Sequence, residues 1–260
     1  MKLTWIDLNS WLFYLGGKTI LVDPWLVDPL EFYGLPWLFT AYHNTPLAVT
    51  PDTLPAVDLI LLSQGVDDHC HKPTLQQLDR SIPVVASPTA AKVVRSLGYQ
   101  QVTELAHWQA FQVGEKVKIT SVLGAEIQPG QVESGYLLQD LTTNETLYYE
   151  PHQAPVQELA ARIGRVDVAI APVIGQIFPL LGQVIMGPEQ ALQLVETVHP
   201  RYFLPTTRGD IRATGILPML TKSVGSVEEF RDRLSASGLS TQLLVPAPGE
   251  MVEIPGPIGC

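Results

Sequence analysis

The sequence predicts an α/β protein in which two β-sheets lie inside and helices cover them. Short runs rich in β-branched and aromatic residues recur in both halves of the chain and are typical of strands. Helix patterns with Pro near the start and Gly near the end alternate with several of these runs, which is typical of α/β layers. No linker rich in Pro, Gly and Ser divides the 260 residues, so we expect a single domain over residues 1–260.

The chain begins with strand patterns and then changes character. Gly16-Gly17 separates two of these patterns and is a hairpin signal, because a tight two-residue turn needs residues that tolerate positive φ. After Asp23-Pro24 the segment of about residues 25–54 combines prolines with many aromatic residues and is too apolar for a solvated linker. We expect this aromatic segment to form a lid or an interface. The first strands are expected over residues 3–6, 11–15 and 19–22.

Strand and helix patterns alternate through the rest of the chain. Pro73 and Pro88 stand in the first turns of two predicted helices, where the missing N–H has no partner to lose, and Gly98 ends the second helix. The further strands are expected over residues 57–62, 83–86, 111–113, 117–122, 135–139, 146–150, 166–171 and 202–204, with a final strand pair over 242–245 and 251–254, and the helices over 73–78, 88–97, 155–163, 188–198 and 227–236.

Composition narrows the function classes. The net charge of −10 and the absence of a basic stripe argue against nucleic acid as a general partner. Two cysteines, Cys70 and Cys260, do not make a secreted disulfide framework. The N-terminus lacks the pattern of a signal peptide, and no apolar run approaches the ~18 residues of a membrane span. We expect a cytoplasmic protein with a small-molecule ligand or substrate; whether it forms a homo-oligomer stays open.

Polar chemistry is concentrated directly after the apolar strand at residues 57–62. The run Asp67-Asp68-His69-Cys70-His71 supplies carboxylate and imidazole groups, which divalent metals such as zinc accept as ligands. The alternative is a polar loop in which Asp68 caps the following helix and the histidines are solvated. Spacing alone leaves both interpretations open.

These residues resemble part of a known family. The metallo-β-lactamase fold carries His-x-His-x-Asp-His at a strand end, and residues 63–69, Ser-Gln-Gly-Val-Asp-Asp-His, are similar to it. The resemblance implies a four-layer αββα sandwich, with the site along one edge of the two sheets, and a metal-dependent hydrolase. Further landmarks in the family's order are Asp23-Pro24, Leu147-Tyr148-Tyr149, Pro248-Gly249-Glu250, and residues 171–175 and 187–191, which look like segments of the ascorbate-6-phosphate lactonase-like subgroup.

The departures from the family pattern concern the metal ligands. Gln64 and Val66 replace the first two histidines, and residues 124–126, Gly-Ala-Glu, stand where a third is expected. His152 falls where the family has its bridging Asp, and Thr206 or Thr207 where it has its last histidine. The motif is therefore degenerate, and the resemblance leaves room for at most one metal.

Two functional interpretations follow from the resemblance. In the first, Asp68, His69 and His152 hold one zinc or other divalent ion for the hydrolysis of an ester, lactone, amide or phosphoester. Asp67 is then a general base or a partner of a ligand. In the second, the metal site is eroded, no metal binds, and the protein is a non-catalytic family member that binds a small molecule or a protein partner. The residues expected to bind substrate are Gln64, Thr207 and Arg208. For Arg208 the sequence slightly favours the alternative, a surface salt bridge with Asp210.

An uncharged stretch, residues 174–182, accompanies the aromatic segment in the predicted pocket wall. Together they predict an apolar pocket that favours a lipophilic or small neutral substrate. A homodimer surface would collect the same residue types, and the sequence leaves that alternative open.

Overall fold

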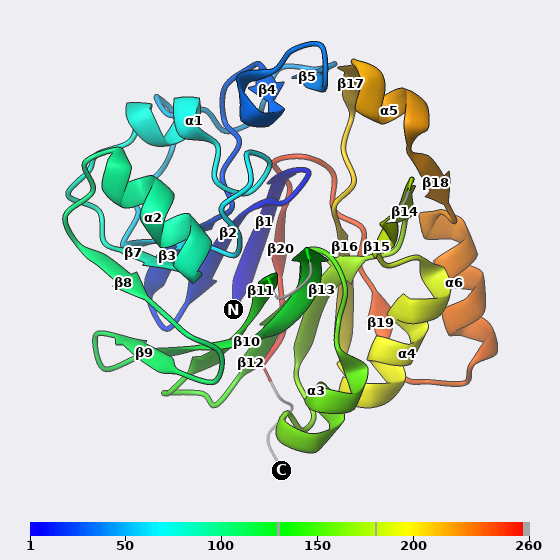
Figure 1. Ribbon diagram of the computed structural model, residues 1–260. Helices are drawn as coiled ribbons and strands as arrows, with labels where there is room; N and C mark the ends of the chain where they lie inside the picture. Colours follow the sequence, from blue (N-terminus) through cyan, green and yellow to red (C-terminus); the bar gives the residue numbers. More distant parts are fainter. Residues whose placement is uncertain (129–130, 180, 257–260) are drawn as a thin grey trace.

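The computed structural model describes residues 1–128, 131–179 and 181–256. Two seven-stranded sheets lie face to face, with helices on the outer side of each (Figure 1). Buried side chains of α1 and α2 pack on the first sheet, and those of α3, α4 and α6 pack on the second. The expected αββα layer order is confirmed.

The first sheet has the strand order β20-β1-β2-β3-β6-β7-β8. Its hairpin between β2 and β3 turns at Gly16 and Gly17, whose φ values of 57° and 71° suit glycine. From β3 onward the strands pair in parallel, with α1 and α2 in the connections. The strands are β1 (Lys2–Asp7), β2 (Ser10–Leu15), β3 (Lys18–Val22), β6 (Leu59–Leu62), β7 (Val84–Ala86), β8 (Val102–Glu104) and β20 (Met251–Glu253).

The second sheet has the strand order β19-β16-β13-β12-β11-β10-β9. Antiparallel hairpins make one half of it, and β12, β13, β16 and β19 run in parallel. Its strands are β9 (Ala110–Val113), β10 (Val117–Gln128), β11 (Gln131–Asp140), β12 (Thr146–Tyr149), β13 (Val168–Pro172), β16 (Tyr202–Thr206) and β19 (Gln242–Leu243).

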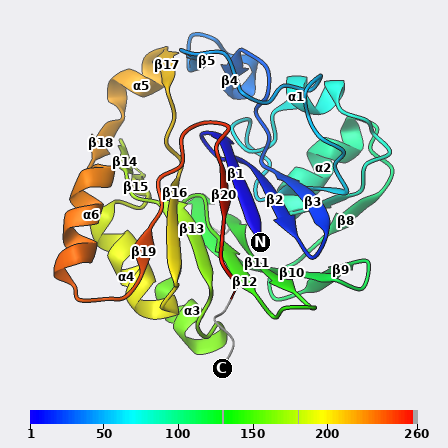
Figure 2. The same cartoon turned by 180° about the vertical axis from the view of Figure 1, so that it is seen from behind.

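The last two strands correct one expectation. The sequence predicts that they pair with each other around Pro248-Gly249, but β19 joins β16 and β20 joins β1, so each extends a different sheet (Figure 2). The connection crosses between the sheets, where Gly249 donates its backbone N–H to the carbonyl of Trp5 at 2.7 Å. Burial of Ile254 between the sheets is the physical reason for this outcome, because a local hairpin would leave that side chain outside the core.

Five of the six α-helices lie where the sequence places them. Serine side chains accept a hydrogen bond from the first turn at two of these helices: Ser87 from Ala90 N and Ser226 from Glu229 N. None of the helices in the described residues is long and apolar enough to cross a membrane. The helices are α1 (Lys72–Gln77), α2 (Pro88–Ser96), α3 (Val156–Arg162), α4 (Pro188–Val198), α5 (Ile216–Leu220) and α6 (Val227–Ala236), with a 3-10 turn η1 (Phe32–Gly34).

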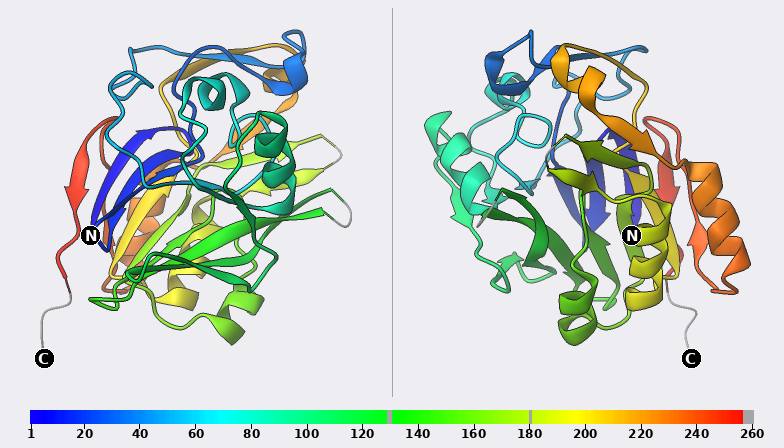
Figure 3. Two further views of the ribbon diagram at one scale, coloured as in Figure 1. Left: turned by 90° about the vertical axis from the view of Figure 1, so that its left-hand side faces the viewer. Right: turned by 45° about the vertical axis from the view of Figure 1, so that its right-hand side comes forward.

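Two small sheets cap one end of the sandwich and were not expected from the sequence. One joins the aromatic segment to a distant strand, because β17 pairs with β5. The blue aromatic segment and the orange β17–α5 region consequently lie together at the top of both views in Figure 3. The strands are β4 (Leu30–Glu31), β5 (Thr40–His43) and β17 (Ile211–Thr214) in one sheet, and β14 (Gly175–Phe178), β15 (Gly182–Ile185) and β18 (Lys222–Val224) in the other.

Candidate metal centre

The predicted site residues lie at one edge of the sandwich because parallel strands end there. In the first sheet β3 and β6 run in parallel, so Asp23 and the loop from Ser63 to His71 begin side by side. In the second sheet β12, β13 and β16 run in parallel, which brings Glu150, His152 and Thr206 to the corresponding edge. The carboxyl ends of parallel strands therefore bring His69 and His152, which are 83 positions apart in the sequence, into one cluster.

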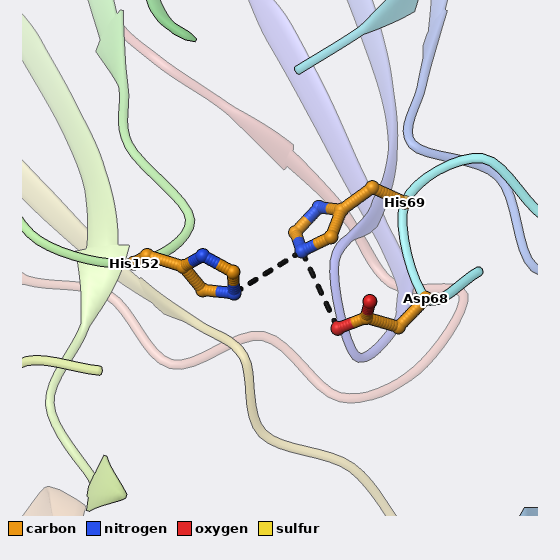
Figure 4. Close-up of side chains that lie close together, drawn as sticks. All are labelled: Asp68, His69 and His152. Carbon is orange, nitrogen blue, oxygen red and sulfur yellow. Dashed lines mark hydrogen bonds and ion pairs between the residues drawn. The ribbon is translucent and has the colours of Figure 1, made fainter. Parts of the chain in front are cut away.

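Asp68, His69 and His152 form the centre of this cluster (Figure 4). Their nearest ligand atoms all lie within 4.8 Å of one another. Nε2 of His69 is 3.3 Å from Oδ2 of Asp68 and 3.3 Å from Nε2 of His152. In a tetrahedral zinc site with bonds of ~2.0–2.1 Å, adjacent ligand atoms are about 3.3–3.4 Å apart. Two of the three distances between the ligand atoms therefore match the spacing that a small cation requires.

His69 is oriented by a second carboxylate below it. Nδ1 of His69 is 2.9 Å from Oδ2 of Asp23, and both side chains are fully buried. Asp23 also accepts hydrogen bonds from Ser63 N at 2.8 Å, from the Ser63 hydroxyl at 2.5 Å and from the Tyr149 hydroxyl at 2.7 Å. With the proton on Nδ1 held toward Asp23, Nε2 points at Asp68 and His152, the arrangement by which carboxylates orient metal-binding histidines.

The electrostatics of the cluster favour positive charge at its centre. Burial lowers the pKa of His69, but the carboxylates of Asp68 and Asp23 outweigh burial and raise it to about 10. Burial also opposes ionisation of Asp68, and the charged His69 overcomes it, so the pKa of Asp68 is lowered. His152 stays neutral, because burial and the neighbouring His69 charge lower its pKa to about 3. In the metal-free chain the protonated imidazole of His69 thus carries the positive charge between the carboxylates of Asp68 and Asp23.

His152 is held from both sides. Its backbone N–H donates to Oε1 of Glu150 at 2.9 Å, and its Nδ1 is 2.7 Å from the side-chain amide of Gln64. An amide offers oxygen or nitrogen at this position. With Oε1 of Gln64 accepting from Nδ1–H, Nε2 of His152 keeps its lone pair for a cation. This pairing requires a flip of the Gln64 amide, because in the structure Nε2 of Gln64 faces Nδ1 and Oε1 has no hydrogen-bond partner among the described residues.

The donor set therefore fits one divalent cation. Two imidazole nitrogens and one carboxylate oxygen are a common set for zinc, and three protein donors leave a position open for water or substrate. Among the described residues no second group of three histidine, cysteine or acidic side chains converges in this way. Val66 offers no donor atom, and the side chains of residues 125 and 126 lie outside the described residues.

Gln64 and Asp67, two further residues singled out in the sequence, hold parts of the site in place. Gln64 is fully buried beneath His152 rather than exposed to the pocket. Oδ2 of Asp67 accepts the backbone N–H of Tyr33 at 2.7 Å, and Oδ1 is 3.3 Å from Nζ of Lys72. Asp67 thereby ties the aromatic segment to the site loop.

Thr207 and Arg208 lie on the other side of the cluster. The Thr207 hydroxyl is 2.8 Å from Oδ1 of Asn9 and 2.7 Å from the carbonyl of Pro151. The Arg208 guanidinium stacks 3.7 Å over the Trp5 ring and donates to the carbonyls of Pro205 and Pro246. These contacts bind both side chains into the fold, and the expected salt bridge of Arg208 with Asp210 is not formed.

A cavity of about 260 Å³ opens onto the cluster. Asp67, Asp68 and His152 form its polar floor, and apolar side chains form its walls. The sequence expectation of an apolar wall from residues 25–54 and 174–182 agrees with this lining, with residue 180 outside the described residues. The lining residues are Phe32, Tyr33, Leu38, Val66, Asp67, Asp68, His152, Phe178, Leu181, Val184, Ile185 and Leu217.

Sequence reasoning gave Asp23 and Asn9 no role in the site. The sequence indicates Asp23 only as part of the Asp23-Pro24 motif. No sequence pattern indicates Asn9, whose Nδ2 is 3.3 Å from Nε2 of His69. One signal appears only in the backbone. Leu8, Asp23 and Thr207 have positive φ values of 45°, 40° and 53°, which non-glycine residues rarely adopt and which often mark functional sites.

Comparison with known proteins places this geometry in context. A family model described as a beta-lactamase superfamily domain matches residues 2–207. A protein of Aeropyrum pernix named UPF0173 metal-dependent hydrolase is 27% identical, with 97% of each chain covered. A protein of the same name from Carboxydothermus hydrogenoformans is also 27% identical, covering 97% of this chain and 99% of its own.

Solved structures show the same architecture. The isothiocyanate hydrolase from Delia radicum gut bacteria superposes with a TM-score of 0.75 at 20% identity, covering 97% of this chain and 99% of that one. A metallo-beta-lactamase fold protein from Bacillus subtilis superposes with a TM-score of 0.65 at 13% identity, covering 97% and 99%. The αββα sandwich is therefore a metallo-β-lactamase fold, and with the family model spanning most of its length the chain belongs to the beta-lactamase superfamily.

Proposed function

We propose that this protein is a hydrolase that uses one divalent cation, held by Asp68, His69 and His152. The observation that carries the proposal is the convergence of three donor atoms on one point, two of them 3.3 Å from Nε2 of His69. The names of the relatives, metal-dependent hydrolases of similar length, support it. Zinc suits this donor set, and a cation there supplies Lewis-acid polarisation of a scissile group and acidifies water beside it.

The residues of this chain divide the remaining work between them. Asp23 holds the His69 proton at Nδ1, and Gln64, once its amide oxygen is turned to His152, does the same for Nδ1 of His152. The two Nε2 atoms then face each other at the candidate metal centre. Asp67 is engaged through both carboxylate oxygens, which supports a positioning role for it rather than that of a general base. The walls from the aromatic segment and β14–β15 exclude water from the reacting group.

We further propose that the aromatic segment, residues 25–54, is a fixed wall of the substrate pocket within one domain. It is bound to the rest of the protein at three places: through β5 to β17, through Tyr33 N to Asp67, and through Leu26 N, which donates to Oγ1 of Thr74 at 2.8 Å.

An isothiocyanate is a second candidate substrate class. A relative in fold is named an isothiocyanate hydrolase, and the specific observation in its favour is the apolar lining of this cavity, which suits a small uncharged electrophile. Loss of the isothiocyanate absorbance on incubation with the protein tests it alongside esters and lactones.

The deciding experiment measures metal content and hydrolysis on the same preparations. Protein purified without an affinity tag is expected to hold close to one equivalent of zinc or another divalent ion and to hydrolyse at least one activated ester. His69→Ala and His152→Ala are expected to lose both. The matched control is His199→Asn, because His199 is an exposed histidine before β16, at the opposite end of the second sheet.

The alternative of a non-catalytic protein makes the opposite prediction. If wild type holds no metal after incubation with zinc, or if His152→Ala retains the metal of wild type, the metal-dependent hydrolase is refuted. Metal that binds through all three residues without hydrolysis of any ester, lactone, amide, phosphoester or isothiocyanate would refute the catalytic part alone.

A further inference from the structure

The charge distribution of the cavity distinguishes between substrate classes. Asp67 and Asp68 are the acidic members of its lining, and His152 and Tyr33 are its other members with a polar group. None of the described residues that line the cavity is Lys or Arg. Phosphate and carboxylate groups are recognised by Arg, Lys or helix N-termini. A phosphate or carboxylate on a part of the substrate remote from the reacting carbonyl would therefore find apolar walls and no cationic side chain in this lining.

The cavity walls are apolar on opposite sides. Phe32 and Leu38 come from the aromatic segment, and Phe178 and Ile185 come from the β14–β15 hairpin. Tyr33 and Leu181 line the cavity and are also 64% and 60% exposed, so apolar surface continues from the interior to the mouth. A volume of about 260 Å³ holds a small group rather than a polymer or a nucleotide.

We propose that the substrate is an uncharged ester or lactone with a small apolar acyl or aryl group. This inference rests on the proposed hydrolase. The apolar group lies between the aromatic segment and the β14–β15 hairpin, and the carbonyl faces Asp68 and His152. Water adds to the carbonyl carbon, the acyl C–O bond breaks, and the alkoxide oxygen leaves with a proton from that water.

The position of Arg208 agrees with an uncharged substrate. Arg208 is the cationic residue that the sequence offered for a substrate carboxylate or phosphate, and its guanidinium is instead committed to the Trp5 ring and two backbone carbonyls. Lys72, which lies 3.3 Å from Oδ1 of the lining residue Asp67, is paired with that carboxylate. Neither side chain is among the lining residues of the cavity.

The test compares two esters of the same leaving group, one with an uncharged acyl chain and one with a charged acyl chain. 4-Nitrophenyl butyrate and the mono-4-nitrophenyl ester of glutaric acid have nearly the same length, and the second ends in a carboxylate. For wild type we expect kcat/KM for the butyrate to exceed that for the glutarate at least 30-fold, with 4-nitrophenyl phosphate not hydrolysed. Equal values, or a preference for the glutarate or the phosphate, would overturn the inference while leaving the hydrolase intact.

Binding without turnover separates the two levels of the proposal. The corresponding anilides, butyranilide and glutaranilic acid, resemble the esters and are much less reactive, so titration calorimetry measures their affinity. We expect butyranilide to bind at least tenfold more tightly. If no ester is hydrolysed and butyranilide still binds preferentially, hydrolysis fails and the selectivity of the pocket stands; if glutaranilic acid binds as well, the selectivity fails.

A matched pair of variants locates the binding. Leu38 lines the cavity, whereas Leu35, in the same segment, is exposed and outside the lining. Leu38→Ser is expected to weaken butyranilide binding about tenfold, because the loss of one apolar contact surface costs roughly 1–2 kcal/mol. Leu35→Ser is expected to leave it unchanged. Equal effects of the two substitutions would show that the apolar group binds elsewhere.

Discussion

Glu150 is a buried carboxyl group beneath the candidate metal centre, and its replacement by Gln tests how the fold accommodates it. Its Oε1 accepts the backbone N–H of His152 at 2.9 Å, and its Oε2 packs so closely on a glycine that a Cβ at Gly135 would lie 2.8 Å from it. Burial raises the pKa of Glu150 to about 8 in the metal-free chain. We expect Glu150→Gln, which keeps the shape and the Oε1 acceptor, to stabilise the fold at neutral pH.

The magnitude follows from the two pKa values of the group. In the unfolded chain Glu150 ionises near its ordinary value of 4.5, and in the folded chain near 8. Because the folded value is the higher one, its contribution to stability is fully present below pH 4.5 and is lost as the pH rises through 8. The loss is about 1.4 kcal/mol per pH unit between these values, or roughly 3 kcal/mol at pH 7.

Urea unfolding in the presence of a chelator measures this effect. The free energy of unfolding of Glu150→Gln minus that of wild type is expected to be below about 1 kcal/mol at pH 5 and to reach about 3 kcal/mol at pH 7. Glu115→Gln, an exposed substitution in the turn before β10, is the control and should match wild type at every pH. A difference that does not change with pH, or a variant less stable than wild type at pH 7, would refute the reasoning.

Three further predictions concern the second layer of the site. Gln64→Leu is expected to weaken zinc binding about 10–100-fold in a chelator competition and Gln64→Glu to preserve it, because only Glu can accept from Nδ1–H of His152; equal affinity of the Leu variant would contradict the assigned role. Asp23→Ala is expected to lower the free energy of unfolding by roughly 3–5 kcal/mol, because it leaves buried donors of Ser63, His69 and Tyr149 without an acceptor. A loss below about 1 kcal/mol in urea unfolding would count against this network. Arg208→Lys is expected to cost roughly 1–2 kcal/mol of stability through the lost stacking on Trp5, with kcat/KM unchanged; a fall in kcat/KM at unchanged stability would return Arg208 to substrate binding.

The local elements could be predicted because their causes are local. The Gly16-Gly17 turn and the helices at residues 188–198 and 227–236 follow from turn chemistry, proline position and side-chain periodicity, and the structure confirms their places. The loop that carries Asp68 and His69 could also be found, because carboxylate and imidazole groups directly after an apolar strand are an unusual local pattern. His152 entered only through the family resemblance, since a lone histidine after a strand has no distinguishing local signal.

Partner choice between distant segments could not be predicted. The strands β19 and β20 have the pattern of a hairpin, yet they extend different sheets, because each buries its apolar side chains against a different layer. The pairing of β5 with β17 joins segments about 170 residues apart, and no short-range pattern specifies it. The small sheet around β14 likewise depends on β18 from a distant part of the chain.

The sequence by itself determined the layer architecture and the chemistry available at the edge of the sheets: two carboxylates and two histidines after β6, and another histidine after β12. Only the tertiary structure decided which of these groups act together. In the folded chain Asp23 contacts Nδ1 of His69, and the Gln64 amide contacts Nδ1 of His152. The Arg208 guanidinium stacks on the Trp5 ring, and the aromatic segment and β14–β15 together line an apolar cavity. The physical reason is that a hydrogen bond or an apolar contact depends on distance in space, and parallel strand ends bring together side chains that the sequence keeps far apart.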